Sequence, residues 1–411
     1  MSRVRILHVN KFLYRRGGAE GYLLDLAALQ RTAGHEVAYF GMEHPDNDQP
    51  SAGRPPAYVE FEPAPAGVPA KVARLGRMVW STSARRGMDE AIEEFRPDVV
   101  HAHNIYHQLS PSVLHAARQR GIPIVLTMHD YKLVCPTYQF LDNGQICTAC
   151  VGRTPWPAVR RACKDGSRAA STAAAVEVSL HRWFGAYDGV QVFVAPSRFL
   201  AQQVTAGGIP GDRVRVLPNF TELDVVFGAP VRRGAVVAGR LSPEKGIDTL
   251  IRAIAGLDLP PGVLLDVAGD GPERPALEAL AAAEAPGRVR FHGRLGRPEL
   301  QELVGEAAVC VVPSRWHENQ PLAVLEAFAL GVPVVATNLG GLPELVDDTT
   351  GWVVPPDDVP ALRGALREAL GSAVESRRRG LAARRVAELE HNPKDHLEAI
   401  TELYREAGAR E

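Results

Sequence analysis

The sequence has no long hydrophobic run and no strong excess of charge of either sign. No apolar stretch reaches the roughly 18 residues that a membrane-spanning helix requires, and so no such helix is expected. The formal net charge is −2, which does not indicate a nucleic-acid partner. Residues 1–18 lack the long apolar segment of a signal peptide. These absences favour a cytoplasmic protein that does not bind nucleic acid.

The sequence does contain a regular alternation of short apolar segments and longer helical patterns. Eleven apolar segments are recognisable, five of them before residue 200 and six after residue 230. This alternation is typical of doubly wound parallel sheets, and eleven strands are too many for one comfortable sheet. We therefore expect an α/β protein with two Rossmann-like domains that face a cleft, where small ligands bind.

The expected domain boundary lies in residues 217–230, an irregular segment that a new strand follows. The N-terminal domain is accordingly predicted over residues 1–220 and the C-terminal domain over residues 221–393. Residues 394–411 are predicted to form a helix at the end of the chain.

Two glutamates accompany an apolar helical pattern in residues 315–336, RWHENQPLAVLEAFALGVPVVA. Glu326 lies among apolar residues, and a buried carboxylate needs either a partner or a ligand. Pro321 suits the first helical position, and Glu318 lies in the loop before it. Both carboxylates can therefore serve one ligand above the helix N-terminus. The alternative is that Glu326 is a half-exposed residue on an imperfect apolar stripe.

Cations and glycines follow several predicted strands of the second half. Arg240 and Lys245 lie between a strand and a helix that starts near Gly246, where a diphosphate fits the charge. Solvated loop cations are the alternative. Glycine turns at 269–272 and 340–341 also follow strands, at the edge where open α/β sheets bind ligands.

Taken together, these motifs resemble those of the family 4 glycosyltransferases, which are retaining enzymes of the GT-B fold. The resemblance covers nearly the whole chain. It rests on Gly17 and Gly18 in RRGGAE, His129 in TMHDY, APSRF at 195–199, PNF at 218–220, GRLSPEKG at 239–246, GDGP at 269–272 and E-x7-E at 318–326.

The resemblance implies transfer of a sugar from a nucleoside diphosphate sugar to an acceptor hydroxyl, with retention and without a catalytic metal. The N-terminal domain would bind the acceptor, which is a small molecule, a glycan or a lipid-linked molecule. The C-terminal domain would bind the sugar nucleotide. The helix at 394–411 would return to the N-terminal domain, as in the fold.

The resemblance also assigns roles to matching positions. His129 and Glu318 would contact the donor sugar at the catalytic centre, and Glu326 would accept hydrogen bonds from the ribose. The other predicted donor-binding residues are Gly17, Gly18, Arg240, Lys245, Arg294, Leu295, Asn319, Gln320, Leu322 and Ala323.

Other readings of the sequence stay open. ENQP stands where many relatives have a glycine-containing EGFG-like stretch, and we expect this difference to alter donor-sugar preference. The Asp46–Asp48 pair resembles the motif of metal-dependent transferases, but those enzymes have a different fold. A sugar-nucleotide epimerase, a pseudo-glycosyltransferase that joins non-sugar units, and a non-catalytic sugar-nucleotide-binding protein are the alternatives.

Four of the five cysteines fall within residues 135–163, here called the cysteine insert. Their spacing is C-x11-C-x2-C-x12-C, at Cys135, Cys147, Cys150 and Cys163. Four thiols with a C-x2-C core suit tetrahedral zinc, but the spacing matches no standard zinc ribbon. A structural zinc site, free thiols and disulfides therefore remain as alternatives. Since the insert begins just after His129, we expect it to shape the acceptor site.

Two segments, 71–86 and 153–168, are rich in basic residues. Peripheral membrane contact, binding of an anionic acceptor, and simple solvation of helix faces would each explain them.

Overall fold

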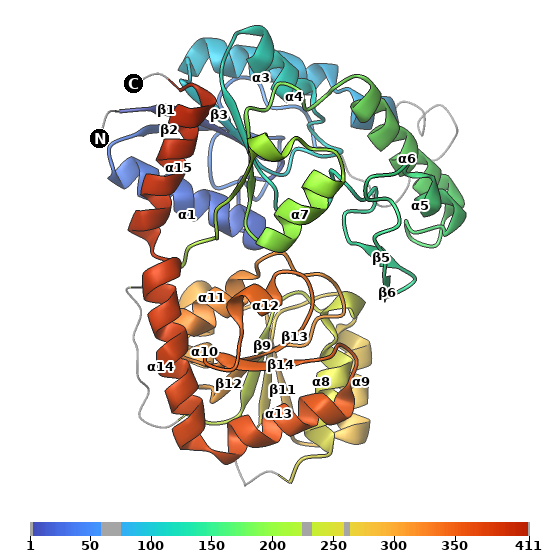
Figure 1. The fold of residues 1–411 in the computed structure, drawn as a ribbon, viewed down its shortest axis with the longest axis vertical. Coiled ribbons are helices and arrows are strands. Elements are labelled where there is room, and N and C mark those ends of the chain that lie inside the picture. The colour runs from blue at the N-terminus through green and yellow to red at the C-terminus, as the bar shows by residue number, and fades with distance from the viewer. Residues whose placement is uncertain (1–2, 59–74, 224–231, 259–263, 410–411) are drawn as a thin grey trace. The chain divides into compact units, whose positions relative to one another are not determined.

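The computed structural model describes residues 3–58, 75–223, 232–258 and 264–409 (Figure 1). Parts of the predicted boundary 217–230 and of the basic segment 71–86 lie outside these residues. The chain divides into two compact units, each described by itself. Unit 1 comprises Met1–Asn143, Cys147–Leu217 and Lys394–Glu411, and unit 2 comprises Gly144–Ile146 and Pro218–Pro393.

Unit 1 contains a parallel sheet of six strands in the order β2-β1-β3-β4-β7-β8. Helices cover both faces of the sheet, and its inner strands are therefore buried along nearly their whole length. The strands are β1 (Arg5–Val9), β2 (Glu36–Phe40), β3 (Val99–Ala102), β4 (Ile124–Thr127), β7 (Val192–Ala195) and β8 (Val214–Val216). The helices are α1 (Gly18–Thr32), α3 (Thr82–Phe95), α4 (Ser112–Gln119), α5 (Trp156–Arg160), α6 (Arg168–Trp183), α7 (Arg198–Ala206) and α15 (Pro393–Ala407).

The last helix, α15, packs beside the first helix, α1, within unit 1 (Figure 1). The hydroxyl of Tyr22 lies 2.9 Å from Nε2 of His396, and the Gln30 amide donates to the hydroxyl of Tyr404 at 2.8 Å. Both α15 side chains are buried, and so the end of the chain forms part of the interior of unit 1.

Unit 2 contains a second parallel sheet of six strands in the order β11-β10-β9-β12-β13-β14. In chain order this is 3-2-1-4-5-6, the arrangement of a dinucleotide-binding Rossmann domain. The strands are β9 (Ala235–Ala238), β10 (Leu265–Ala268), β11 (Val289–Gly293), β12 (Val309–Val312), β13 (Val334–Thr337) and β14 (Gly351–Val354). The helices are α8 (Ile247–Ala255), α9 (Arg274–Glu284), α10 (Arg297–Glu306), α11 (Leu322–Ala329), α12 (Leu342–Leu345), α13 (Val359–Gly371) and α14 (Ala373–Glu390).

Alternate strand residues of unit 2 enter different cores because successive side chains point to opposite faces of the sheet. Val237 and Val309 join one core, whereas Val236 and Cys310 join the other. Cys310 is therefore a core residue.

The prediction of two parallel α/β domains is confirmed, and all eleven predicted strands are present. The sequence patterns missed β8 and the short hairpin strands β5 (Leu141–Asp142) and β6 (Gln145–Ile146). These strands are only two or three residues long, and so they lack the apolar runs by which the others were recognised.

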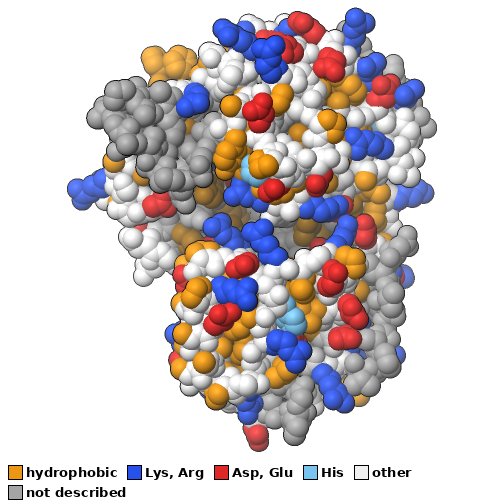
Figure 2. Space-filling view, turned by 180° about the vertical axis from the view of Figure 1, so that it is seen from behind, with side chains coloured by type: hydrophobic (Ala, Val, Ile, Leu, Met, Phe, Trp, Pro, Cys, Tyr) orange, Lys and Arg blue, Asp and Glu red, His pale blue; other side chains and the backbone are white. Residues whose placement is uncertain are grey.

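Within the described residues, no helix is long and apolar enough to cross a membrane. On the face that Figure 2 displays, basic and acidic side chains are interspersed over both units.

Candidate active site

The site in unit 2 lies where the order of the strands reverses, between β9 and β12. The two connections leave these neighbouring strands in opposite directions, which opens a crevice at the carboxyl edge of the sheet. The loop after β9 carries Arg240 and Lys245, and the loop after β12 carries Glu318.

An ion pair joins the two loops. Nζ of Lys245 donates to Oε1 of Glu318 at 2.7 Å, and the Ser314 hydroxyl donates to the same oxygen at 2.6 Å. Nζ of Lys245 also lies 5.3 Å from the centre of the Trp316 ring, a cation–π distance. Burial raises the pKa of Glu318, but Lys245 and the hydrogen bonds outweigh burial and hold the pKa below its ordinary value.

Gly340 allows the Glu318 loop to pack against the turn after β13. Gly340 has φ of +63°, and a Cβ there would lie 2.2 Å from the backbone oxygen of Glu318. Gly341 donates its amide to that oxygen at 2.7 Å. The backbone oxygen of Glu318 is therefore fixed against the turn after β13, which helps to position the carboxylate.

The structure buries Glu318 more deeply than Glu326. Glu318, predicted in a loop, is 5% exposed, whereas Glu326 in α11 is only half-buried. Helix α11 begins at Leu322, and Pro321 is its cap residue rather than its first helical residue. The half-exposed alternative for Glu326 is thus the one that the structure shows, and only the position of Pro321 was predicted wrongly. A loop folded over by other loops is buried without any apolar pattern of its own, as Glu318 is.

The helix start at α11 supplies hydrogen-bond donors to the same edge. No side chain caps this helix, and the first amides of a helix have no partner within it. The predicted ligands Leu322 and Ala323 are the first two residues of α11.

Arg240 is exposed in the loop after β9 and makes no ion pair among the described residues. Two glycines bring the neighbouring turn against this loop. A Cβ on Gly269 would lie 1.8 Å from the oxygen of Gly239, and one on Gly271 would lie 2.2 Å from that of Leu241. These glycines thus support the Arg240 loop by close backbone packing.

The remaining predicted donor-binding residues have different surroundings. Arg294 is exposed and Leu295 is half-buried in the turn after β11. Gln320 is buried and accepts from the backbone amide of Asn219, while the Asn219 side chain donates to the Gln320 backbone oxygen at 3.2 Å. Gln320 therefore fastens the start of unit 2 to this loop, and Asn319 beside it is half-buried.

In unit 1 the strand order reverses between β1 and β3. The loop after β1 leads to Gly17 and Gly18, both exposed, which cap and start α1. The side chain of Asn10 accepts from the backbone amide of Asn104 at 2.9 Å and so joins the two loops at the reversal.

A chain of hydrogen-bonded imidazoles runs through the sheet of unit 1 to His129, which lies just beyond β4. Nε2 of His8 lies 2.7 Å from Oε1 of Gln30, and its Nδ1 lies 3.1 Å from Nε2 of His103. Nδ1 of His103 in turn lies 3.1 Å from Nε2 of His129. Of these histidines, only His129 was predicted as a site residue, although the segments HVN and VVHAHN place His8 and His103 at strand ends.

These histidines are held neutral. Burial lowers the pKa of His8 to about 4 and that of His129 to about 3, and it lowers the pKa of His103 well below 6.5. The chain is therefore a set of neutral imidazoles in which each ring donates once and accepts once.

His8, His101 and His103 have ring nitrogens within 4.8 Å of one another, a spacing that could suit a metal. The hydrogen bonds that these rings already make argue against a metal ion. The nitrogens of His101 lie 2.7 Å from the Tyr404 hydroxyl and 2.8 Å from the Thr127 hydroxyl. Since both nitrogens of every ring in the group are engaged, a metal would have to break existing hydrogen bonds.

A buried ion pair lies beside the cysteine insert. Nζ of Lys132 donates to Glu177 at 2.8 Å and to the backbone oxygen of Pro136 at 3.1 Å. The other carboxylate oxygen of Glu177 lies 3.1 Å from Nδ1 of His107. The contact ties the insert to α6, and the sequence analysis missed it because the partners lie 45 residues apart.

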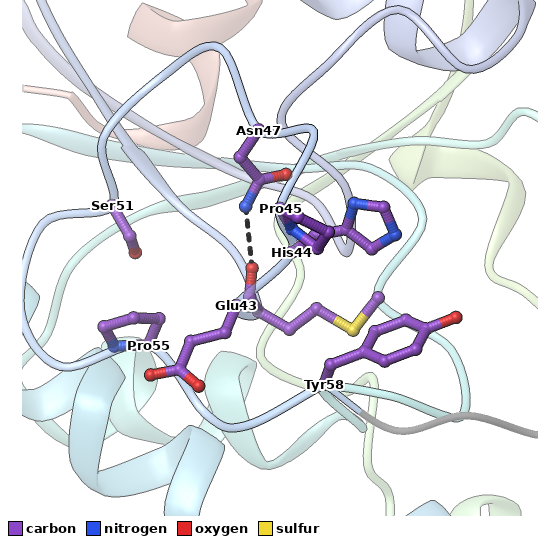
Figure 3. A pocket seen from close by; sticks show the side chains of 8 residues that line it. Glu43, His44, Pro45, Asn47, Ser51, Pro55 and Tyr58 are labelled. Atoms are coloured by element: carbon purple, nitrogen blue, oxygen red, sulfur yellow. Dashed lines mark hydrogen bonds between the residues drawn. The ribbon is translucent and has the colours of Figure 1, made fainter.

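A pocket of about 420 Å³ lies beside the loop after β2 in unit 1 (Figure 3). Glu43, His44 and Tyr58 give it polar walls, and the Asn47 side chain donates to the backbone oxygen of Met42 at 2.9 Å. The rings of His44 and Tyr14 stack with centres 4.8 Å apart, which joins the pocket to the loop after β1. Its volume falls within the range typical of small-molecule sites.

The structure also gathers the cysteine insert around one small enclosed cavity. Its walls include all four predicted ligands, Cys135, Cys147, Cys150 and Cys163. Cys135 and Cys150 are buried, and the other two are half-buried.

Several solved structures resemble the whole chain, and one of them is a glycosyltransferase from Rickettsia africae that aligns over 99% of each chain with a TM-score of 0.69 at 16% identity. Sucrose-phosphate synthase from Thermosynechococcus elongatus aligns with a TM-score of 0.72 over 98% of each chain at 20% identity. The Anabaena protein Alr3699/HepE, solved with UDP and glucose, aligns with a TM-score of 0.67 at 18% identity, over 98% of this chain and 100% of that one. At these identities the alignments establish the fold class.

The sequence comparisons give the family. The model for "Glycosyltransferase Family 4" matches residues 16–225, and that for "Glycosyl transferases group 1" matches residues 232–372. The chain therefore belongs to the family 4 glycosyltransferases.

Two relatives are similar to this chain over most of its length. A D-inositol 3-phosphate glycosyltransferase of Streptomyces avermitilis is 29% identical over 90% of this chain and 79% of its own length. A GDP-mannose-dependent alpha-mannosyltransferase of Mycolicibacterium smegmatis is 28% identical over 93% of this chain and 92% of its own.

Proposed function

We propose that the protein transfers a sugar from a nucleoside diphosphate sugar to an acceptor hydroxyl, with retention and without a catalytic metal. The observation that carries this proposal is the fixed charge at the strand reversal of unit 2. There Lys245 is held by the buried Glu318, and the exposed Arg240 lies on the same loop. Membership of the glycosyltransferase family and the UDP bound by the Anabaena protein support it.

Unit 2 binds the donor in this proposal. Arg240 and Lys245 neutralise the diphosphate, and the amides of Leu322 and Ala323 donate to it at the positive end of α11. These groups stabilise the leaving diphosphate electrostatically, the role that a metal ion plays in other transferases. Glu326 accepts from the ribose hydroxyls, and Glu318 holds hydroxyls of the sugar.

Other predicted residues complete the donor site. The backbone near Arg294 and Leu295 contacts the base, Asn319 and Gln320 influence the choice of sugar, and His129 contacts the donor sugar from unit 1. The glycine turn at 17–18 contacts phosphate or acceptor.

The proposed reaction step needs no separate general base. The bond from the sugar C1 to the phosphate oxygen breaks while a bond from C1 to the acceptor oxygen forms on the same face. The acceptor proton passes to the leaving phosphate, and attack on the departing face retains the anomeric configuration.

We propose the pocket beside the loop after β2 as the acceptor site. Its walls offer a carboxylate, an imidazole and a phenol, which suit an acceptor rich in hydroxyls. Replacement of His44 by alanine is expected to raise the KM for the acceptor about 10-fold while the Kd for the donor stays constant. An unchanged acceptor KM would place the acceptor elsewhere.

The central test is calorimetry with UDP-, GDP-, ADP- and dTDP-sugars, followed by NMR of products formed with candidate acceptors. Retention requires that an α-linked donor yield an α-linked product, and metal independence requires turnover without added Mg²⁺ or Mn²⁺. A β-linked product, or turnover only after Mg²⁺ or Mn²⁺ is added, would contradict the stereochemical or the metal-free part, respectively. Isomerisation of the donor without acceptor would identify an epimerase. Tight donor binding with no turnover across the panel would indicate a binding protein.

A further inference from the structure

We propose that the cysteine insert is a structural zinc site whose ligands are the four thiolates of Cys135, Cys147, Cys150 and Cys163. Residues separated by up to 28 positions converge on one enclosed cavity, which is unlike the scatter expected of unrelated thiols. Four sulfur ligands are the donor set that tetrahedral zinc prefers.

The insert needs a cross-link because it has little structure of its own. It contains two strands of two residues each and a helix of five residues. Among the described residues, nine that are not glycine have positive φ, and four of these are in the insert, namely Tyr138, Phe140, Asn143 and Ala162. Each such residue costs of order 1 kcal/mol, which a metal cross-link would offset.

The charge around the sulfurs fits a thiolate cluster. Zinc with four thiolates carries a net charge of −2, and Nη1 of Arg161 already donates to the sulfur of Cys147 at 3.0 Å.

The sulfur atoms of the four cysteines lie further apart than the ligands of a zinc-bound site. No three of these four atoms lie within 4.8 Å of one another in the described structure, whereas tetrahedral Zn–S geometry places them about 3.8 Å apart. Zinc binding is therefore expected to draw the insert together and to raise its resistance to proteolysis.

The test is metal analysis of the full chain purified without chelators. We expect about one zinc per chain, and we expect Co²⁺ exchanged into the site to show the intense visible bands of tetrahedral thiolate coordination. Cys147→Ser should lose most of the zinc, whereas Cys310→Ala, which alters the core cysteine of β12, should keep it.

Counting the free thiols in denaturant with EDTA distinguishes the zinc-bound insert from a metal-free insert and from one with disulfides. Five free thiols together with bound zinc in the native protein support the site. Five free thiols in a folded chain that takes up neither zinc nor cobalt would overturn it. A single free thiol would mean two disulfides and would also overturn it. None of these outcomes depends on donor or acceptor chemistry.

A second inference rests on the proposed function of His129 and on the imidazole chain. We infer that Gln30 is a positioning residue that selects the tautomer of His129 through His8 and His103. The chain places the bare nitrogen of His129 at Nδ1, ready to accept a hydrogen bond from a substrate hydroxyl.

The tautomers follow from the direction of the first bond. The amide nitrogen of Gln30 donates to the Tyr404 hydroxyl, so its oxygen accepts from Nε2 of His8. Nδ1 of His8 is then bare and accepts from Nε2 of His103, whose own Nδ1 accepts from Nε2 of His129. Nε2 of His129 carries the hydrogen, and Nδ1 carries the lone pair.

Tyr404 controls which way the amide of Gln30 points. Its hydroxyl lies 2.7 Å from Nδ1 of His101, and Nε2 of His101 lies 2.8 Å from the Thr127 hydroxyl. A rotated amide would reverse every bond in the chain. Residues from α1 and α15 therefore decide the state of a ring at the end of β4.

The test is ¹⁵N NMR of histidine-labelled protein, in which protonated and bare imidazole nitrogens have distinct shifts. We expect a bare Nδ1 on His129 in the wild type and a mixture of tautomers in Gln30→Met. The kcat should fall about 10-fold in that variant with little change in the Kd for donor. Tyr404→Phe should give a smaller fraction of the second His129 tautomer than Gln30→Met does. Gln202→Met, which alters an exposed residue, should give none of it.

A protonated Nδ1 in the wild type, or an unchanged tautomer in Gln30→Met, would overturn this inference. If the proposed function fails instead, the NMR result stands while the kcat effect disappears, and so the two failures are distinguishable.

Discussion

Both sheets end in a polar edge where their strand order reverses, but the two edges are stabilised differently. In unit 2 the edge is charged, with Lys245 and Glu318 compensating each other at 2.7 Å. In unit 1 the imidazole chain that reaches the edge is neutral, because burial lowers the pKa values of His8, His103 and His129. Lys11, on the loop after β1, interacts electrostatically with Asp130 and Glu20. A buried group must either find an opposite charge or give up its own.

The difference suits each edge to a different ligand. In unit 2, the exposed Arg240 and the uncapped start of α11 attract an anion, whereas a neutral ring with a defined lone pair recognises a hydroxyl. The comparison can be tested by removing charge from one edge and adding charge to the other.

The largest effect is expected from Lys245→Ala. It removes a diphosphate ligand and leaves the Glu318 carboxylate buried without its counter-charge, and so kcat/KM should fall about 100-fold or more. Chemical denaturation should show a loss of about 2 kcal/mol or more, since breaking a buried pair is costly. The control is Arg290→Ala, which removes an exposed cation of β11 and should change neither kcat/KM nor the free energy of unfolding. Equal activity of the two variants would remove Lys245 from the donor site.

The next effect is on nucleotide binding. Glu326→Ala removes an acceptor proposed for two ribose hydroxyls, and the Kd for the nucleoside diphosphate should rise about 10- to 100-fold by calorimetry. Glu302→Ala, at an exposed position of α10, is the matched control. An unchanged Kd in Glu326→Ala would show that the ribose binds elsewhere.

Acidification should weaken unit 1 through its buried histidines. The folded pKa of His8 is about 4, below 6.5, and so the unfolded chain binds more protons between these values and stability falls as the pH drops. The loss approaches about 1.4 kcal/mol per pH unit for each such histidine. The pKa of Glu318 is held low, and so its contribution persists until the pH falls below about 4.5.

Denaturation of wild type and His8→Asn at pH 5 and pH 7.5 measures this effect. The variant should show the smaller difference in free energy of unfolding between the two pH values. The same difference in both proteins would mean that His8 is not neutral in the folded state.

The smallest effect concerns backbone support of the charged edge. Gly340→Ala places a Cβ against the oxygen of Glu318 at positive φ, and it should destabilise unit 2 by about 1 kcal/mol or more. Gly364→Ala lies inside α13 with no atom within 4 Å of its Cβ, and it should stabilise by up to about 1 kcal/mol. Thermal denaturation distinguishes the two, and a stabilised Gly340→Ala would show that this close approach is not required.

Local patterns were enough to predict strands and their edges. Apolar segments such as AVVA at β9 and IVLT at β4 have few alternatives to a buried parallel strand, and their order along the chain predicted two sheets. The same patterns placed Arg240, Lys245 and His129 just after strands, where the structure has them.

Contacts between distant segments could not be predicted from these patterns. The partner of Lys245 is 73 residues away, and the partner of Asn219 is 101 residues away. Burial of Glu318 arises from three loops meeting, and the sequence around it contains no apolar signal for that meeting. Burial was therefore considered only for Glu326, whose neighbours are apolar, and the structure shows the half-exposed alternative there.

By itself the sequence determined which segments become strands and helices and which chemistry-bearing residues follow them, because periodicity and glycine turns are local properties of the chain. Only the tertiary structure decided which polar groups compensate one another and which nitrogen of His129 is bare. Those outcomes depend on exclusion of water and on hydrogen-bond direction across elements far apart in the chain, and neither exists until the sheets have formed.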